Sequence, residues 1–148
     1  RDSMAMSDGC TFCRILRGEL PKVFVEDGRH AVAFLDRNQA ARGHLLIVAR
    51  AHVASWHELD EATISEMALM SHRWSRRLTT VLHVQAYNLL VNNGAAAGQD
   101  VMHVHRHLAP RVTGDGYYEF GYKVTRLAED EVRALEALLI GAAGENDA

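Results

Sequence analysis

The stretch that decides the fold is residues 92–111, NNGAAAGQDVMHVHRHLAPR. His103, His105 and His107 alternate with other residues in this stretch. Successive side chains of a β-strand point to opposite faces, so these rings are expected to line one surface, roughly 7 Å apart at a rise of about 3.3 Å per residue. The alternative is a solvent-facing polar stripe, which would not need the glycine-containing loop before it. We therefore predict a strand over residues 103–109 that carries a functional site.

Imidazole rings in this arrangement suit phosphate chemistry. The unperturbed pKa of imidazole is about 6.5, so a histidine acts as nucleophile, acid or base near neutrality. The loop from Gly94 to Asp100 also contains Gly98, and such a loop turns backbone N–H groups toward an anion. A phosphate-binding loop followed by a strand of histidines indicates phosphoryl or nucleotidyl transfer through a covalent histidine intermediate.

The rest of the pattern predicts an α+β domain. Residues 23–36 read as a hairpin with its turn at EDGR, residues 26–29. A long helix begins at about Asp60, capped by Asp60 or Thr63. Short turns between strands favour an antiparallel sheet. The further elements expected are strands over residues 43–49 and 86–93 and a closing helix over residues 128–140.

Composition limits the class of protein. The 148 residues are 48% apolar and carry a formal charge of -3, which is typical of one soluble globular domain. That charge argues against a nucleic acid partner, which requires a positive surplus. No window approaches the roughly 18 apolar residues of a membrane span, and no export signal precedes the domain. We therefore expect a cytoplasmic protein in a reducing compartment, where a disulfide between Cys10 and Cys13 would not persist.

Residues 92–111 resemble the signature of the histidine triad (HIT) superfamily. The shared features are His-x-His-x-His before two apolar positions, with an upstream Asn-x-Gly and a Gly-Gln pair. CTFCRILRGELPKVFVEDGRHAVAFLD, residues 10–36, and GHLLIVARAH, residues 43–52, resemble the N-terminal half of the family in order and spacing. The resemblance covers about two thirds of the chain, residues 10–111.

The resemblance implies the HIT fold, a five-stranded antiparallel sheet with one long helix and a C-terminal helix. It places a single HIT domain at residues 9–141, between a disordered leader or expression remnant at 1–8 and a disordered tail at 142–148. Relatives pair through the long helix and the fourth strand, so we expect a homodimer.

The resemblance also assigns roles in catalysis. His105 would attack the α-phosphate and carry the nucleotidyl group, and His107 would assist the leaving group. His44 and Gln99 fall at further positions of the active site, and His44 is expected to order the triad. The positions that hold phosphate are Asn92, Gly98, Gln99, Asp100 and Val101. Asp100 departs from the family, because many relatives have serine there.

The resemblance also implies which residues form the nucleoside pocket. Asp36 would accept hydrogen bonds from both ribose hydroxyls. The base pocket is apolar in relatives and maps to Phe12, Ile15, Leu20, Phe34 and Leu35, for which plain core packing is the alternative. Arg106 is a second departure, because this position is normally apolar. A buried unpaired charge is costly, so either an acid reaches Arg106 or that face is wetter than in relatives.

The Cys-x-x-Cys pair, Cys10 and Cys13, has several readings by itself. Haem attachment would require histidine where Arg14 stands, and a redox site would require a βαβ setting. Two packed free thiols remain an alternative, and a zinc site requires two more ligands. Zinc-binding microbial HIT proteins use such a pair together with two histidines, here His52 and His103. The resemblance thus implies a closed Cys₂His₂ set that holds a structural zinc.

Together these implications predict a nucleotidyl hydrolase or transferase that acts on purine nucleotides. The Hint-like branch, which cleaves adenosine phosphoramidates and aminoacyl adenylates, is the first expectation. A dinucleoside polyphosphate hydrolase, a slow regulatory module that binds purine nucleotides, and a metal-dependent hydrolase remain alternatives. The segment with Tyr117, Tyr118, Phe120 and Tyr122 lies where relatives diverge and could shape the choice of leaving group.

Overall fold

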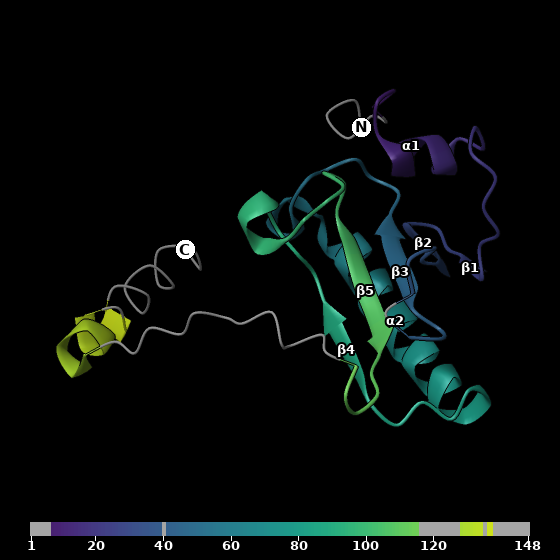
Figure 1. Cartoon of the computed structure of the whole chain (residues 1–148). Coiled ribbons are helices and arrows are strands. Elements are labelled where there is room, and N and C mark those ends of the chain that lie inside the picture. The colour runs from purple at the N-terminus through teal and green to yellow at the C-terminus, as the bar shows by residue number, and fades with distance from the viewer. Residues whose placement is uncertain (1–6, 40, 116–127, 135, 138–148) are drawn as a thin grey trace. The chain divides into compact units, whose positions relative to one another are not determined.

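The computed structural model describes residues 7–39, 41–115, 128–134, 136 and 137. The chain divides into two compact units, residues 1–115 and 116–148. The first unit contains a five-stranded sheet in the order β1-β2-β3-β5-β4, antiparallel throughout (Figure 1). This confirms the predicted α+β class and sheet. The elements are α1 (Thr11–Leu16), β1 (Glu26–Asp27), β2 (Ala31–Leu35), β3 (Leu45–Ala49), η2 (Trp56–Glu58), α2 (Glu61–Val81), β4 (Tyr87–Leu90), η3 (Ala95–Ala97) and β5 (His105–Pro110).

The central strands β2 and β3 are buried on both faces. Alternate side chains divide between two clusters, because successive residues of a strand face opposite ways. On one face Val32, Phe34, Leu46 and Val48 pack with residues of α1. On the other, where α2 runs along the sheet in Figure 1, small side chains meet Met67 and Met70. These small residues are Ala31, Ala33 and Ala49, and they leave room for the helix.

The long helix begins as predicted and is hydrogen-bonded to the start of β2. Of the two expected caps, Asp60 is the one used, because its side chain accepts the Thr63 N–H at 2.9 Å. One turn further on, the Glu66 carboxylate accepts the N–H groups of His30 at 2.5 Å and Ala31 at 2.6 Å. A Cβ at Gly28 would lie 2.9 Å from that carboxylate and 2.8 Å from the Ala31 carbonyl, so only glycine fits.

The hairpin turn lies later than predicted. Glu26 and Asp27 belong to β1, where they pair with Ala33 and Val32, and the turn spans residues 28–30. Glu26 is held in the strand by α2, because it accepts hydrogen bonds from Arg73 at 2.5 Å and from the indole of Trp74 at 2.9 Å. A turn-like sequence is thus extended because its acidic side chain has partners on the helix.

The other boundaries differ in smaller ways. β4 is shorter than the expected strand over residues 86–93, and β5 begins at His105, so His103 precedes it. In the second unit, residues 129–134, 136 and 137 are helical. The end of that predicted helix, the tail at 142–148, the four aromatic residues of 117–122 and most of the leader lie outside the described residues. The domain limits remain a prediction. No helix among the described residues is long and apolar enough to cross a membrane.

Candidate active site and metal centre

The sheet register places two of the three histidines on the face that α1 covers. His105 pairs with Val48 and His107 with Leu46, and both partners point toward α1. The two imidazole centroids lie 5.1 Å apart, and the Phe12 ring of α1 stands edge-on to His105 at 4.9 Å. His103 precedes the strand; its ring also packs edge-on against Phe12, at 5.8 Å between centroids, and its Nδ1 lies beside Cys10 and Cys13. The prediction that one strand carries all three rings is therefore wrong for His103.

The protonation of His105 is fixed by the backbone. Its Nδ1 lies 2.7 Å from the carbonyl oxygen of His103, and a carbonyl only accepts, so Nδ1 carries the proton. In the neutral ring the lone pair is then on Nε2, and the side chain is only 3% exposed. A buried imidazole with Nδ1 held by the backbone and no hydrogen bond to Nε2 among the described residues is arranged to act as a nucleophile.

His107 has a histidine and a carboxylate beside it. His44 Nε2 lies 3.0 Å from His107 Nδ1 and 3.6 Å from the Asp36 carboxylate. Burial, with smaller effects from His105 and His44, lowers the pKa of His107 to about 4. Burial also lowers the pKa of His44. Both rings are neutral at pH 7, and an anion bound beside His107 would favour its protonated form.

The predicted phosphate loop is held together by Gln99. This buried amide donates to the carbonyls of Ala54 at 2.7 Å and Val101 at 3.0 Å, and accepts the Gly94 N–H at 2.7 Å. Both amide hydrogens of Gln99 are engaged, so the side chain shapes the loop. Gly98 lies at a φ of 90°, which favours glycine, and its carbonyl accepts from Asn92 at 3.5 Å.

The Asp100 carboxylate occupies the mouth of this loop. One oxygen accepts the Val101 N–H at 2.9 Å and lies 3.6 Å from His105 Nε2. A phosphate oxygen would have the same two neighbours, a backbone N–H and the nucleophilic nitrogen. The Asp100 side chain is 79% exposed, so it is free to swing away.

A hollow of about 310 Å³ adjoins the histidines and gathers the predicted nucleoside residues. Phe12, Ile15 and Phe34 belong both to the buried core and to the hollow, so core packing and binding are not exclusive for them. Leu20, Leu35 and Asp36 complete the predicted set. Sequence reasoning missed five further lining residues: Thr11, Pro21, Lys22, Arg37 and Leu46. Leu46 belongs to the predicted strand over residues 43–49, but its pairing with the histidine strand is known only from the structure.

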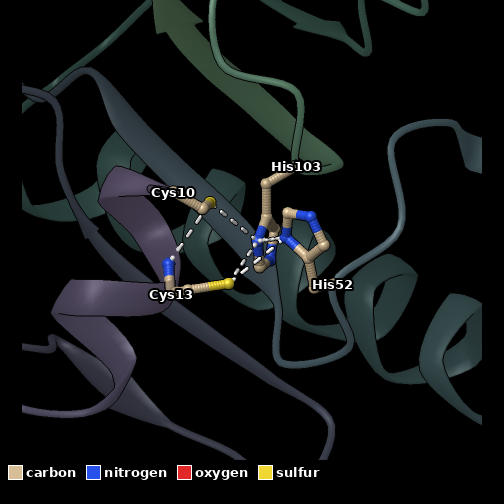
Figure 2. A group of neighbouring side chains, drawn as sticks. All are labelled: Cys10, Cys13, His52 and His103. Carbon is tan, nitrogen blue, oxygen red and sulfur yellow. Dashed lines mark hydrogen bonds between the residues drawn. The ribbon is translucent and has the colours of Figure 1, made fainter. Parts of the chain in front are cut away.

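Cys10, Cys13, His52 and His103 converge on one point (Figure 2). His103 Nδ1 lies 3.4 Å from Cys10 Sγ and 3.5 Å from Cys13 Sγ, and His52 Nδ1 lies 3.2 Å from Cys13 Sγ and 3.1 Å from His103 Nδ1. Tetrahedral zinc, with bonds of about 2.3 Å to sulfur and 2.0–2.1 Å to nitrogen, puts its ligands about 3.3–3.8 Å apart. The four donors therefore fit a closed site that could hold a metal.

The His103 ring is prepared for a metal by its other nitrogen. Nε2 lies 2.6 Å from the Ala49 carbonyl and must donate, so the lone pair of Nδ1 faces the two sulfurs. Burial lowers the pKa of His103 to about 4, which keeps the ring neutral. Neither cysteine forms a disulfide. A zinc site suits these four donors better than a redox function of the two cysteines. A redox Cys-x-x-Cys would require a βαβ setting, and Cys10 and Cys13 lie at the short helix α1 instead.

Arg106 lies on the opposite face, paired with Ile47 toward α2. Its Nε is buried without a hydrogen-bond partner, and burial lowers the pKa of the guanidinium. Within the described part of the chain no acid pairs with Arg106, so the first of the two alternatives, an acid that reaches it, is not found there.

Known proteins are similar to this chain in sequence. Residues 17–114 match the model of the HIT domain family. The chain belongs to the HIT family. An uncharacterized HIT-like protein of Methanocaldococcus jannaschii is 36% identical over 83% of this chain and 95% of its own length. Adenosine 5'-monophosphoramidase hnt1 of Schizosaccharomyces pombe is 30% identical over 85% of this chain and 92% of its own.

Two solved structures agree with the fold. A hypothetical protein from Leishmania major superposes with a TM-score of 0.83 at 30% identity, covering 95% of this chain and 99% of that one. A Zn-bound histidine triad family protein from Mycobacterium smegmatis has a TM-score of 0.67 at 28% identity, covering 93% of this chain and 97% of that one.

The lowered pKa of His107 links acid stability to this residue. The folded state binds fewer protons than the unfolded state between pH 6.5 and 4, so stability is present above pH 6.5 and is lost as pH falls. Discounted for partial exposure, the loss from His107 at pH 5 is about 1 kcal/mol. In urea unfolding at pH 7.5 and pH 5, His107→Gln should lose about that much less stability than the wild type. His72→Gln, exposed on α2, is the control and should follow the wild type; equal losses in all three proteins would contradict the assignment.

Proposed function

We propose that this HIT protein hydrolyses purine nucleotides at the α-phosphate, with His105 as the nucleophile. The observation that carries the proposal is the tautomer of neutral His105: its Nδ1 donates to the His103 carbonyl, which leaves Nε2 as the reacting nitrogen, and Phe12 beside it lines a hollow of about 310 Å³. The substrates proposed first are adenosine phosphoramidates and aminoacyl adenylates. The S. pombe relative named as an adenosine 5'-monophosphoramidase supports this class.

The proposed reaction has two displacements. His105 Nε2 attacks the α-phosphorus, a P–N bond to His105 forms, and the bond from phosphorus to the leaving amine or carboxylate breaks. His107, protonated beside the bound phosphate, gives its proton to the leaving group. Water then attacks the nucleotidyl-histidine, His107 takes up a proton of that water, and the P–N bond breaks to release the nucleoside monophosphate.

The substrate would be positioned by the elements around the triad. Asp36 is proposed to accept both ribose hydroxyls, and the base would lie among the apolar residues of the hollow. Backbone N–H groups of the loop at Asp100 and Val101 would hold the phosphate, and His44 would orient His107 through their 3.0 Å contact. Gln99 would contribute indirectly, because its amide holds the shape of the loop that binds the phosphate.

We further propose that the metal centre holds a structural zinc. Cys10, Cys13, His52 and His103 supply four ligands and leave no position for water, which a catalytic zinc would need. Zinc bound there would supply no reaction step; it would tie α1 to residue 103. The Zn-bound relative from M. smegmatis supports this proposal.

The enzyme proposal is tested with an adenosine phosphoramidate that carries a fluorogenic amine. His105→Ala should abolish release of the amine, while zinc measured by elemental analysis stays stoichiometric in both proteins. His72→Ala, exposed on α2, should retain full activity. A wild type that binds AMP but releases no amine would refute the phosphoramidase reading and favour dinucleoside polyphosphates or a sensor. Equal turnover by His105→Ala would refute the nucleophile.

Asp100 is expected to weaken phosphate binding, because its carboxylate lies where a phosphate oxygen would lie. Asp100→Asn should therefore lower the Kd of AMP, measured by calorimetry, by about threefold to fivefold, as expected for an exposed charge contact of up to about 1 kcal/mol. Glu61→Gln removes the same charge from an exposed position of α2 and should leave the Kd unchanged. Weaker AMP binding by Asp100→Asn would show that the carboxylate supports the substrate.

We also propose a homodimer through α2 and β4. Among the described strands β4 ends the order, so its outer edge has no strand partner there and offers backbone groups to a second copy. Apolar side chains are exposed on both elements, including Leu89 at 37% on β4 and Leu69 at 60% on α2. Light scattering after size-exclusion chromatography should give twice the mass of the chain; the mass of one chain would contradict the proposal.

A further inference from the structure

A second group of metal-ligating atoms lies outside the cysteine cluster. Donor atoms of Asp36, His44 and His107 lie within 4.8 Å of one another. His44 Nε2 is the central atom, 3.0 Å from His107 Nδ1 and 3.6 Å from Asp36 Oδ2. Nitrogen and oxygen ligands of a tetrahedral zinc are about 3.3 Å apart, so these two distances lie on either side of the required spacing.

The ligand types of the group favour a cation. Each of the two imidazoles directs one nitrogen into the group, Nε2 of His44 and Nδ1 of His107. Asp36 adds a carboxylate, and its side chain is only 18% exposed. A cation in the centre would replace the contact between two neutral imidazoles by three metal–ligand bonds.

We propose that Asp36, His44 and His107 form a second, inhibitory site for a divalent transition metal. Two imidazoles and one carboxylate select zinc, cobalt, nickel or copper over magnesium and calcium, which prefer all-oxygen sites. Three protein ligands without thiolate bind more weakly than the closed Cys₂His₂ set. The second site therefore fills only after the first, when free metal rises.

Inhibition follows from the ligands themselves. A metal at this site takes the Asp36 carboxylate that the ribose hydroxyls need, and it fixes His107, which must move a proton to the leaving group. Metal and nucleotide therefore exclude each other. The metal site stands on its own geometry, and only this exclusion rests on the proposed function.

Cobalt titration of the metal-free protein distinguishes the two sites. The first equivalent of Co²⁺ should produce the thiolate charge-transfer band of the cysteine site. A second equivalent should add visible ligand-field absorption with no further thiolate band. Asp36→Asn should lose the second phase and keep the first. Asp27→Asn, a carboxylate on β1 that is 63% exposed and pairs with Arg50, is the matched control and should keep both phases.

The titration distinguishes failure of the metal site from failure of the proposed nucleotide function. A titration that ends at one equivalent, or a second phase that survives in Asp36→Asn, overturns the second site. With the second phase present, AMP should raise the concentration of Co²⁺ needed for it at least tenfold. If AMP binds but leaves that phase unchanged, the exclusion is wrong. If AMP does not bind at all, the proposed nucleotide function fails, while the loss of the second phase in Asp36→Asn still establishes the metal site.

Discussion

The hydrogen bond from His103 Nε2 to the Ala49 carbonyl is the constraint on which both centres depend. At 2.6 Å it fixes the proton of a fully buried ring and directs Nδ1 toward the two sulfurs. The carbonyl oxygen of the same residue accepts the Nδ1 hydrogen of His105 at 2.7 Å, so Nε2 is the nitrogen that can react. Residue 103 therefore gives its side chain to the metal centre and its backbone to the nucleophile. A shift of this one residue would disturb the metal ligands and the reacting nitrogen together.

The sequence allowed much of the fold to be predicted because its patterns are local. Alternation in residues 103–109 indicated the strand, and the register confirms that His105 and His107 share a face. His103 lies outside the strand, and its ring contacts Cys10 and Cys13, about ninety residues earlier in the chain. The turn at residues 26–29 was misplaced because Glu26 has partners on α2. Both departures involve contacts between distant segments of the chain.

In the candidate site, too, some features could be predicted from the sequence and others could not. The family resemblance indicated six residues of the hollow and the four metal donors, and the structure brings each set together. The resemblance did not indicate that the Gln99 amide would form hydrogen bonds that shape the loop. Nor did it indicate that the Asp100 carboxylate would lie 3.6 Å from His105 Nε2. Both depend on side-chain direction, which residue type alone does not determine. Arg106 is a departure of another kind, since its buried Nε has no partner among the described residues.

The metal centre has a consequence for the polymer chain itself. A cation held by Cys10, Cys13 and His103 closes a loop of about ninety residues, and such a cross-link removes conformational freedom from the unfolded chain in the way a disulfide does. Its N-terminal anchor is α1, which has only six residues and would be marginal as an isolated helix. The same helix supplies Phe12 and Ile15, one wall of the nucleoside hollow. A zinc ion that never touches a reacting atom would thus govern whether that wall is in place, and with it the affinity of the protein for nucleotides.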